Sequence, residues 1–304
     1  MQKILSNINP SNNTIEIIFR ISCAVMLIGH GWVCLNGKMP LTALLWDEQL
    51  MSGLITSITG EDWNSWVTSL EVGDVINNII RLQGIIFILF AVTLLIRSEK
   101  KWFNFIYIII SGNLLFLAIL KFLDSRVGIG NLLEHASQFC MPLIVFFIAK
   151  NKDMKGTSMI LAKVSIAFAF IFHGLFAVNF RHEMTIFDHA RPGHFTEMVM
   201  LSLGITQESF ANSILLIAGI LDFIAAALIF SKGTPRNMGL IYMFVWGALT
   251  AMARPWSRFD SYEIFESLII WIPEMLYRTP HFMIPFCLLL ALNIKSDHGK
   301  LPSN

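Results

Sequence analysis

The feature that most constrains this chain is a series of long apolar runs, separated by shorter segments that hold most of the charged residues. Each run is about 20 residues long, which is the length that an α-helix needs to cross the hydrocarbon core of a bilayer. Of the 304 residues, 55% are hydrophobic and 14% are charged, whereas about a quarter are charged in a typical soluble domain. The sequence therefore predicts an all-α, polytopic membrane protein.

We expect about eight transmembrane helices, because a helix satisfies its own backbone polar groups inside the bilayer. The predicted spans cover residues 17–36, 76–96, 102–123, 132–149, 159–180, 210–230, 238–253 and 275–294. Pro280 and Pro285 interrupt the last span, so a kink is expected there.

The charges between the spans predict the orientation. The short segments after the second, fourth and sixth spans are rich in basic residues, namely Arg97, Lys100, Lys101, Lys150, Lys152, Lys155, Lys232 and Arg236. The long segment after the first span is acidic. The positive-inside rule then predicts a multi-pass protein of the cell (inner) membrane with both termini in the cytoplasm. Every histidine except His298 falls at or beyond the outer end of a span, so the outer half is where we expect a site.

An internal repeat organises the chain. The segment RISCAVMLIGHGWVCLN, from Arg20, aligns without gaps with KVSIAFAFIFHGLFAVN, from Lys163. Weaker matches follow in the same order, at Gly84/Gly219, Gly112/Gly247 and Pro142/Pro285. Ordered matches across four spans predict a tandem duplication into units 1–152 and 153–304, each a four-helix bundle. Because each unit has an even number of spans, the two are expected to be related by a pseudo-twofold axis along the membrane normal.

A span that runs from a basic residue through small and apolar residues to a His-Gly pair resembles the first helix of the DoxX-like family, which includes the DoxD type. The pattern occurs twice, at residues 20–31 and 163–174. The family usually follows it with a lysine-containing segment, which Lys38 matches loosely, whereas the second copy has Arg181. The resemblance implies four-span units, and it implies a quinone as ligand and a redox protein as partner. No motif for a covalent cofactor accompanies it, and the cofactor stays unknown.

Polar residues inside the predicted spans are the candidates for a site, because they are costly in a bilayer unless they face the bundle interior and are partnered. His30 and His173 end the two copies of the motif, and each precedes a glycine. One interpretation is a structural hydrogen bond across the bundle. The other is an imidazole that moves protons or binds a headgroup, since its ordinary pKa is close to neutrality.

Asp222 is the most anomalous residue, because it lies in the middle of the sixth predicted span. Its position aligns with Phe87, so the two halves have diverged in charge. A carboxylate at this depth is expected either to line a polar site or to form a structural ion pair. Arg81, Arg254 and His173 are its candidate partners.

Other charged residues gather towards the outer ends of the spans. The complete set of ligand-binding or proton-relay candidates is His30, His173, Asp222, Arg81, Gln83, Lys121, His135, Arg254, Arg278 and His281. The basic residues of this set have two interpretations. They are either interfacial side chains that extend to the aqueous phase, or a positively charged entrance that attracts an anion or a quinone-like headgroup.

The outer segment RHEMTIFDHARPGH contains His182, His189 and His194, which are the weak candidates for metal ligands. Their spacing matches no established metal site. We therefore predict a solvated loop and no metal here.

The sequence thus predicts a DoxX-like membrane protein whose outward-facing polar cavity binds a small or lipid-soluble molecule, and the resemblance implies the quinone-interacting membrane subunit of an oxidoreductase system. The alternatives are a small-molecule or ion transporter with Asp222 as the coupling site, and a non-catalytic scaffold or assembly subunit. The net charge of +1 and the lack of a basic stripe argue against a nucleic-acid partner.

Overall fold

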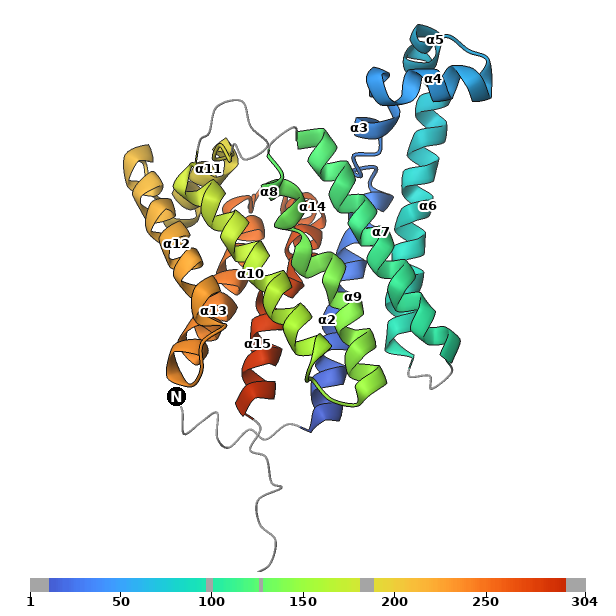
Figure 1. Ribbon diagram of the computed structural model, residues 1–304. Helices are drawn as coiled ribbons and strands as arrows, with labels where there is room; N and C mark the ends of the chain where they lie inside the picture. The colour runs from blue at the N-terminus through green and yellow to red at the C-terminus, as the bar shows by residue number, and fades with distance from the viewer. Residues whose placement is uncertain (1–10, 97–100, 126–127, 181–188, 294–304) are drawn as a thin grey trace, which may run out of the picture.

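The computed structural model describes residues 11–96, 101–125, 128–180 and 189–293, with the backbone alone for residues 101–104 (Figure 1). Every regular element in these ranges is a helix, which confirms the all-α prediction. The helices are α2 (Asn12–Leu35), α3 (Thr42–Leu45), α4 (Glu48–Thr59), α5 (Trp63–Thr68), α6 (Leu70–Leu95), α7 (Lys101–Ser125), α8 (Gly130–Leu133), α9 (Ala136–Asn151), α10 (Thr157–Val178), α11 (Gly193–Leu203), α12 (Glu208–Leu228), α13 (Thr234–Ser257), α14 (Ile264–Leu276) and α15 (Thr279–Asn293).

Six helical segments of the described chain are long and apolar enough to cross a bilayer. They are α2, α6, Phe105–Ser125 within α7, Gly130–Asn151 across α8 and α9, α10 and α12. The bent pair α14 and α15 makes a seventh if it counts as one span. The protein is therefore a multi-pass helical protein suited to a lipid bilayer, but the prediction of eight spans is not confirmed.

The seventh predicted span, at residues 238–253, lies within α13, which is not among these segments. This helix carries Arg236 and Arg254 near its two ends and Tyr242 and Thr250 between them. These side chains lower its hydropathy, and they indicate a helix that faces the protein interior along part of its length.

The last predicted span, at residues 275–294, is not one kinked helix. The chain instead breaks at Tyr277 and Arg278, and α14 and α15 meet at an angle of 42°. The break directly precedes Thr279 and Pro280, the first two residues of α15, where a proline is tolerated because an N–H at that position would have no acceptor within the helix. Pro285, in contrast, lies inside α15.

Figure 1 shows α3, α4, α5, α8, α11 and α14 towards one end of the molecule, which we call the loop-rich end. α2 begins and α15 ends at the opposite end. The two ends of the described chain therefore share one side.

Two pairs of repeated glycines make the same close contact in the two halves. A Cβ atom on Gly84 would lie 2.7 Å from the carbonyl oxygen of Gly31, and one on Gly219 would lie 2.8 Å from that of Gly174. Helices in lipid associate through close packing at small residues. The contact thus joins α2 to α6 and α10 to α12 in the same way, which supports a duplicated origin.

The helices of the two halves are interleaved. α2 packs on α6, but it also contacts α14 and α15 more extensively than α9 of its own half. α10 likewise packs on α12 and on α9. One continuous core therefore holds both halves together, with the fully buried Phe19, Met26, Phe87, Ile144 and Ile166 among its members.

Candidate functional site

Polar side chains gather between the two halves, towards the loop-rich end, and are buried or half-buried. We call this set the polar cluster: His30, Lys121, Glu134, His135, Gln138, His173, Asp222, Tyr242, Arg254, Glu274, Tyr277, Arg278 and His281. It includes eight of the ten ligand-binding or proton-relay candidates. The break between α14 and α15 brings Tyr277 and Arg278 into its centre.

The first-half side of the cluster is filled by a stack of side chains. His30 Nε2 lies 3.0 Å from Gln138 Oε1 and donates to it, because a carbonyl oxygen only accepts. The His30 ring stacks on Tyr277 with centroids 4.9 Å apart and planes 14° apart. Lys121 Nζ lies 4.7 Å from the centre of the same tyrosine ring, which is a cation–π distance. Phe87 closes this side, with its ring 5.8 Å from that of His30.

The hydrogen bonds of His135 fix its tautomer. Its Nδ1 lies 2.7 Å from the Asn131 carbonyl oxygen and donates to it. In the neutral ring Nε2 is then an acceptor, and Lys121 Nζ donates to it over 3.2 Å. Lys121 is therefore held between an imidazole nitrogen and an aromatic face.

The second-half side is more open and more charged. Glu134 lies 3.7 Å from His135 Nδ1 and 3.8 Å from His173 Nε2, so one carboxylate of the first half bridges to the second half. The rings of His173 and His281 meet edge to face with centroids 5.5 Å apart. Arg254 donates to Glu274 Oε2 over 3.0 Å.

A partly enclosed cavity of about 60 Å³ lies on this side, which we call the site cavity. It is lined by Phe170, His173, Ala177, Phe195, Met198, Leu215, Ala218, Asp222, Trp246, Gly247, Thr250, Arg254, Arg278 and His281. Five candidates from the sequence thus meet at one space, which is large enough for a few water molecules.

Asp222 lies in the cavity wall, with 2% of its surface exposed. Its Oδ1 lies 2.9 Å from the Tyr242 hydroxyl, which also lies 3.2 Å from the Ala218 carbonyl oxygen. No cation of the described chain lies within 4 Å of Asp222, so it forms none of the ion pairs considered from the sequence. The Tyr242 hydroxyl is therefore the hydrogen-bond partner of Asp222 in the described chain.

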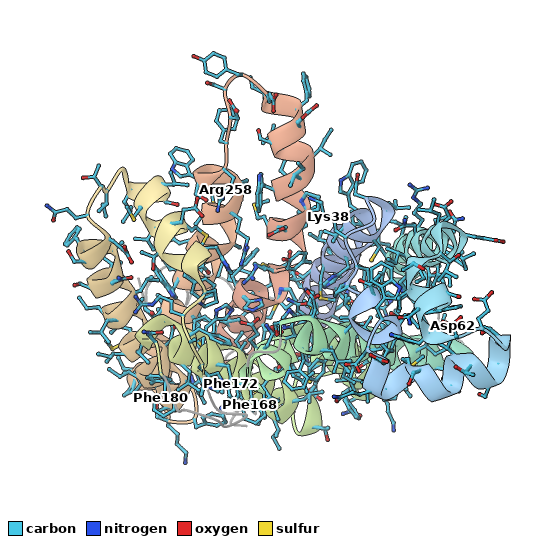
Figure 2. The ribbon with its side chains drawn as sticks, turned by 90° about the horizontal axis from the view of Figure 1, so that it is seen from above. Lys38, Asp62, Phe168, Phe172, Phe180 and Arg258 are labelled. Carbon is cyan, nitrogen blue, oxygen red and sulfur yellow. The ribbon has the colours of Figure 1, made fainter. Side chains whose placement is uncertain are left out.

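A second cavity, which we call the vestibule, adjoins the first and shares Met198 and Arg254 with it. Its volume is about 180 Å³, and it is lined by His194, Met198, Arg254, Ser257, Arg258, Trp271 and Glu274. Burial, together with the positive charge of Arg254, lowers the pKa of His194 to about 4. Figure 2, which looks onto the loop-rich end, shows Arg258 at this face.

Two candidates lie elsewhere. Arg81 is exposed on α6 and forms no hydrogen bond or ion pair with the described residues. Gln83 donates to Asn113 Oδ1 over 3.0 Å and joins α6 to α7. Neither of the two lines the site cavity.

The weak metal candidates do not form a site in the described part of the chain. His182 lies outside the described residues. His189 is buried against Phe172 and Phe176, whereas His194 lies in the vestibule. Among the described residues, no three histidine, cysteine, aspartate or glutamate side chains gather as metal ligands.

Several members of the polar cluster were not among the sequence candidates, namely Glu134, Gln138, Tyr242, Glu274 and Tyr277. The repeat contained a signal for some of them. Pro142 and Pro285 are 143 positions apart, and the same shift pairs Gln138 with His281 and Glu134 with Tyr277. His30 meets Gln138 where His173 meets His281, so each histidine has the partner that this shift assigns.

The fold and the site together define a multi-pass helical membrane protein with a polar cavity that residues of the second half enclose. Compared with protein-family models, with curated proteins and with solved structures, the chain matches none of them.

Proposed function

We propose that this protein binds a small or lipid-soluble molecule in the site cavity, through the polar side chains that line it. The observation that carries the proposal is the meeting of His173, His281, Arg254, Arg278 and Asp222 at one partly enclosed space. Imidazole and guanidinium groups both stabilise oxygen that gains negative charge, and imidazole also exchanges protons near neutral pH.

A quinone headgroup is the first ligand class to test, with the protein as the membrane subunit of an oxidoreductase. The resemblance of the two His-Gly spans to the DoxX-like family supports this class. Electrons would then come from, or pass to, a partner protein. A cavity that holds a benzene ring has a volume of roughly 150 Å³, so a quinone ring would enter only after side chains such as Phe195 and Met198 move.

The test is purification of the full chain in a mild detergent, followed by mass spectrometry of bound quinones, lipids and partner proteins. We expect a quinone in the wild type and its loss in Asp222→Asn and His173→Ala. Arg81→Gln is the control, because this arginine is exposed and lies away from the cavity. Protein that carries no quinone and no redox partner, with unchanged composition in the variants, would contradict the quinone proposal.

Transport is the second candidate function, and the environment of Asp222 favours it. This acid lies deep in α12 with a hydroxyl partner instead of a cation, which is suited to protonation and release during a transport cycle. Proton-coupled uptake into proteoliposomes, abolished by Asp222→Asn, would support transport. A scaffold role would instead appear as a protein that shows no transport and binds no small molecule, and whose deletion causes a partner complex to fall apart.

The proposed location is the cell (inner) membrane, with both ends of the chain in the cytoplasm. The shared side of the two ends supports one location for both (Figure 1). Reporter fusions to each terminus in cells would test it. Opposite responses from the two fusions would contradict the proposed topology.

A further inference from the structure

The site cavity has one end that is rich in unpartnered donors. Arg254 Nε and Arg278 Nε are both buried, and neither has a hydrogen-bond partner among the described residues. Both side chains line the same cavity. Buried donors in native proteins are nearly always partnered. Two such donors at one space therefore indicate an acceptor that the described chain does not itself supply.

The charges at this end are also unbalanced. Arg254 is paired with Glu274, but no carboxylate of the described chain lies within 4 Å of Arg278. The guanidinium of Arg278 instead lies 5.8 Å from the centre of the Tyr277 ring. Glu134, another acid of the cluster, interacts with Arg278 electrostatically, but its contacts within 4 Å are with His135 and His173. A buried cation without a carboxylate in direct contact is costly between membrane helices, so an anion at Arg278 would lower this cost.

Asp222 does not provide this anion. It lies in the same cavity wall, but its carboxyl group accepts a hydrogen bond from the Tyr242 hydroxyl. Asp222 is 14 residues from the start of α12 (222 − 208), which is about 20 Å along the helix axis. Arg254, in contrast, is three residues from the end of α13 (257 − 254). Both of these helix ends belong to the loop-rich end, so the acid lies deeper than the arginine.

The walls between these two depths are apolar. Phe170, Leu215 and Trp246 line the cavity along with the polar groups. An inorganic oxyanion would satisfy the arginines and leave these walls without contacts. A carboxylate that carries a short apolar tail matches both parts, and the cavity volume of about 60 Å³ restricts it to a few non-hydrogen atoms.

The vestibule offers a route of entry for an anion. It adjoins the arginine end of the site cavity through Met198 and Arg254. Arg258 lies in its wall, where it forms a bidentate pair with Glu197 that has a shortest distance of 2.5 Å. Arg254 is likewise paired with Glu274, so the vestibule gives access to the site cavity without an excess of positive charge of its own.

We propose that the Arg254–Arg278 end of the site cavity binds the carboxylate of a small organic acid, whose apolar tail lies against Phe170, Leu215 and Trp246. The planar guanidinium matches a carboxylate with two parallel hydrogen bonds. The inference rests on the proposed function only in treating this cavity as a ligand site. It names a substrate class for the transport candidate and does not depend on quinone binding.

The experiment is a thermal unfolding titration of the purified full chain with propionate as the probe. Propionamide is the neutral probe of the same shape, and sulfate is the inorganic anion. Sodium chloride keeps the ionic strength constant throughout. We expect propionate to raise the unfolding temperature with saturation, because a ligand that binds only the folded state stabilises it. Propionamide and sulfate are expected to give no saturable rise.

Variants then locate the site. Arg278→Gln and Arg254→Gln are each expected to weaken propionate binding at least about tenfold, since each removes a charge-assisted pair of hydrogen bonds. Arg278→Lys keeps the positive charge but loses the planar guanidinium group. This variant should weaken propionate binding less than Arg278→Gln does. Arg81→Gln removes one positive charge from an exposed position of α6, away from the site cavity. This variant should therefore bind propionate with the affinity of the wild type.

An oleate titration distinguishes the source of the carboxylate. Saturable binding of propionate supports a free acid, whereas binding of oleate alone, lost in Arg278→Gln, supports the headgroup of a membrane fatty acid. Both outcomes support the carboxylate site. Saturable responses of equal size to propionate and propionamide, a saturable response to sulfate alone, or no saturable response to either propionate or oleate would overturn it, and these comparisons need no variant. Absence of quinone from purified protein bears on the proposed redox role and leaves this inference standing.

Discussion

His30 Nε2 lies 3.0 Å from Gln138 Oε1, and this bond closes the first half of the protein at the position where the second half is open. In the second half His173 faces His281, and both side chains line the site cavity. Phe87 fills the first half where Asp222 lines the second. The first half is thus packed at this position, whereas the second half has a cavity.

The His30–Gln138 bond is expected to stabilise the fold. Replacement of Gln138 with leucine leaves the buried His30 N–H without its acceptor, which costs roughly 1–3 kcal/mol. Thermal or denaturant unfolding in detergent measures the loss. Gln49→Leu, at an exposed position of α4, is the control and should change stability little. Equal stability of Gln138→Leu and the wild type would show that His30 is satisfied in another way.

The contact between Gly84 and Gly31 leaves no room for a side chain. Gly84→Ala and Gly219→Ala are each expected to destabilise the protein by about 1–3 kcal/mol, because the new Cβ meets backbone atoms that cannot move aside. Gly112→Ala is the matched control, since a Cβ there meets no atom within 4 Å. This control should be neutral or slightly stabilising, as alanine favours a helix. A similar loss in all three variants would refute the close contact.

The Arg254–Glu274 pair and Asp222 should respond differently to charge removal. Arg254→Met leaves the half-buried Glu274 without its cation. We therefore expect the free energy of unfolding to fall by on the order of 3 kcal/mol. Asp222→Asn breaks no ion pair with the described residues and keeps an acceptor for Tyr242, so its loss should be smaller, roughly 1 kcal/mol. Unfolding measurements on both variants test the order. The reverse order would reveal a charge partner of Asp222.

The stability of the fold should depend on pH through His194. Its folded pKa of about 4 lies below the unfolded value of about 6.5. The unfolded state therefore binds more protons between these values, and stability falls as pH falls from about 6.5 towards 4. His194→Asn is expected to flatten this part of the profile relative to the wild type. Unfolding curves measured at several pH values give the comparison, and an unchanged slope would contradict the assignment.

The sequence by itself determined the helical membrane class and the approximate positions of most long helices. Apolar runs of bilayer length leave few other structures, because backbone polar groups must be satisfied within each segment. The repeat also identified Gly31, Gly84, Gly174 and Gly219, whose lack of a side chain is what permits the close contacts. These are local properties of composition and order along the chain, and a sequence records them directly.

Only the tertiary structure decided which polar residues meet. Arg81 and Lys121 both looked like site residues, but Arg81 turns outwards on α6 whereas Lys121 contacts His135 and Tyr277. Such choices depend on helix rotation and on packing between residues more than a hundred positions apart. The placement of Arg278 also depends on long-range packing. The break between α14 and α15 puts this cation at a cavity that α10, α12 and α13 help to form. The sequence specifies the charges, and the long-range packing of the helices decides which of them share a cavity.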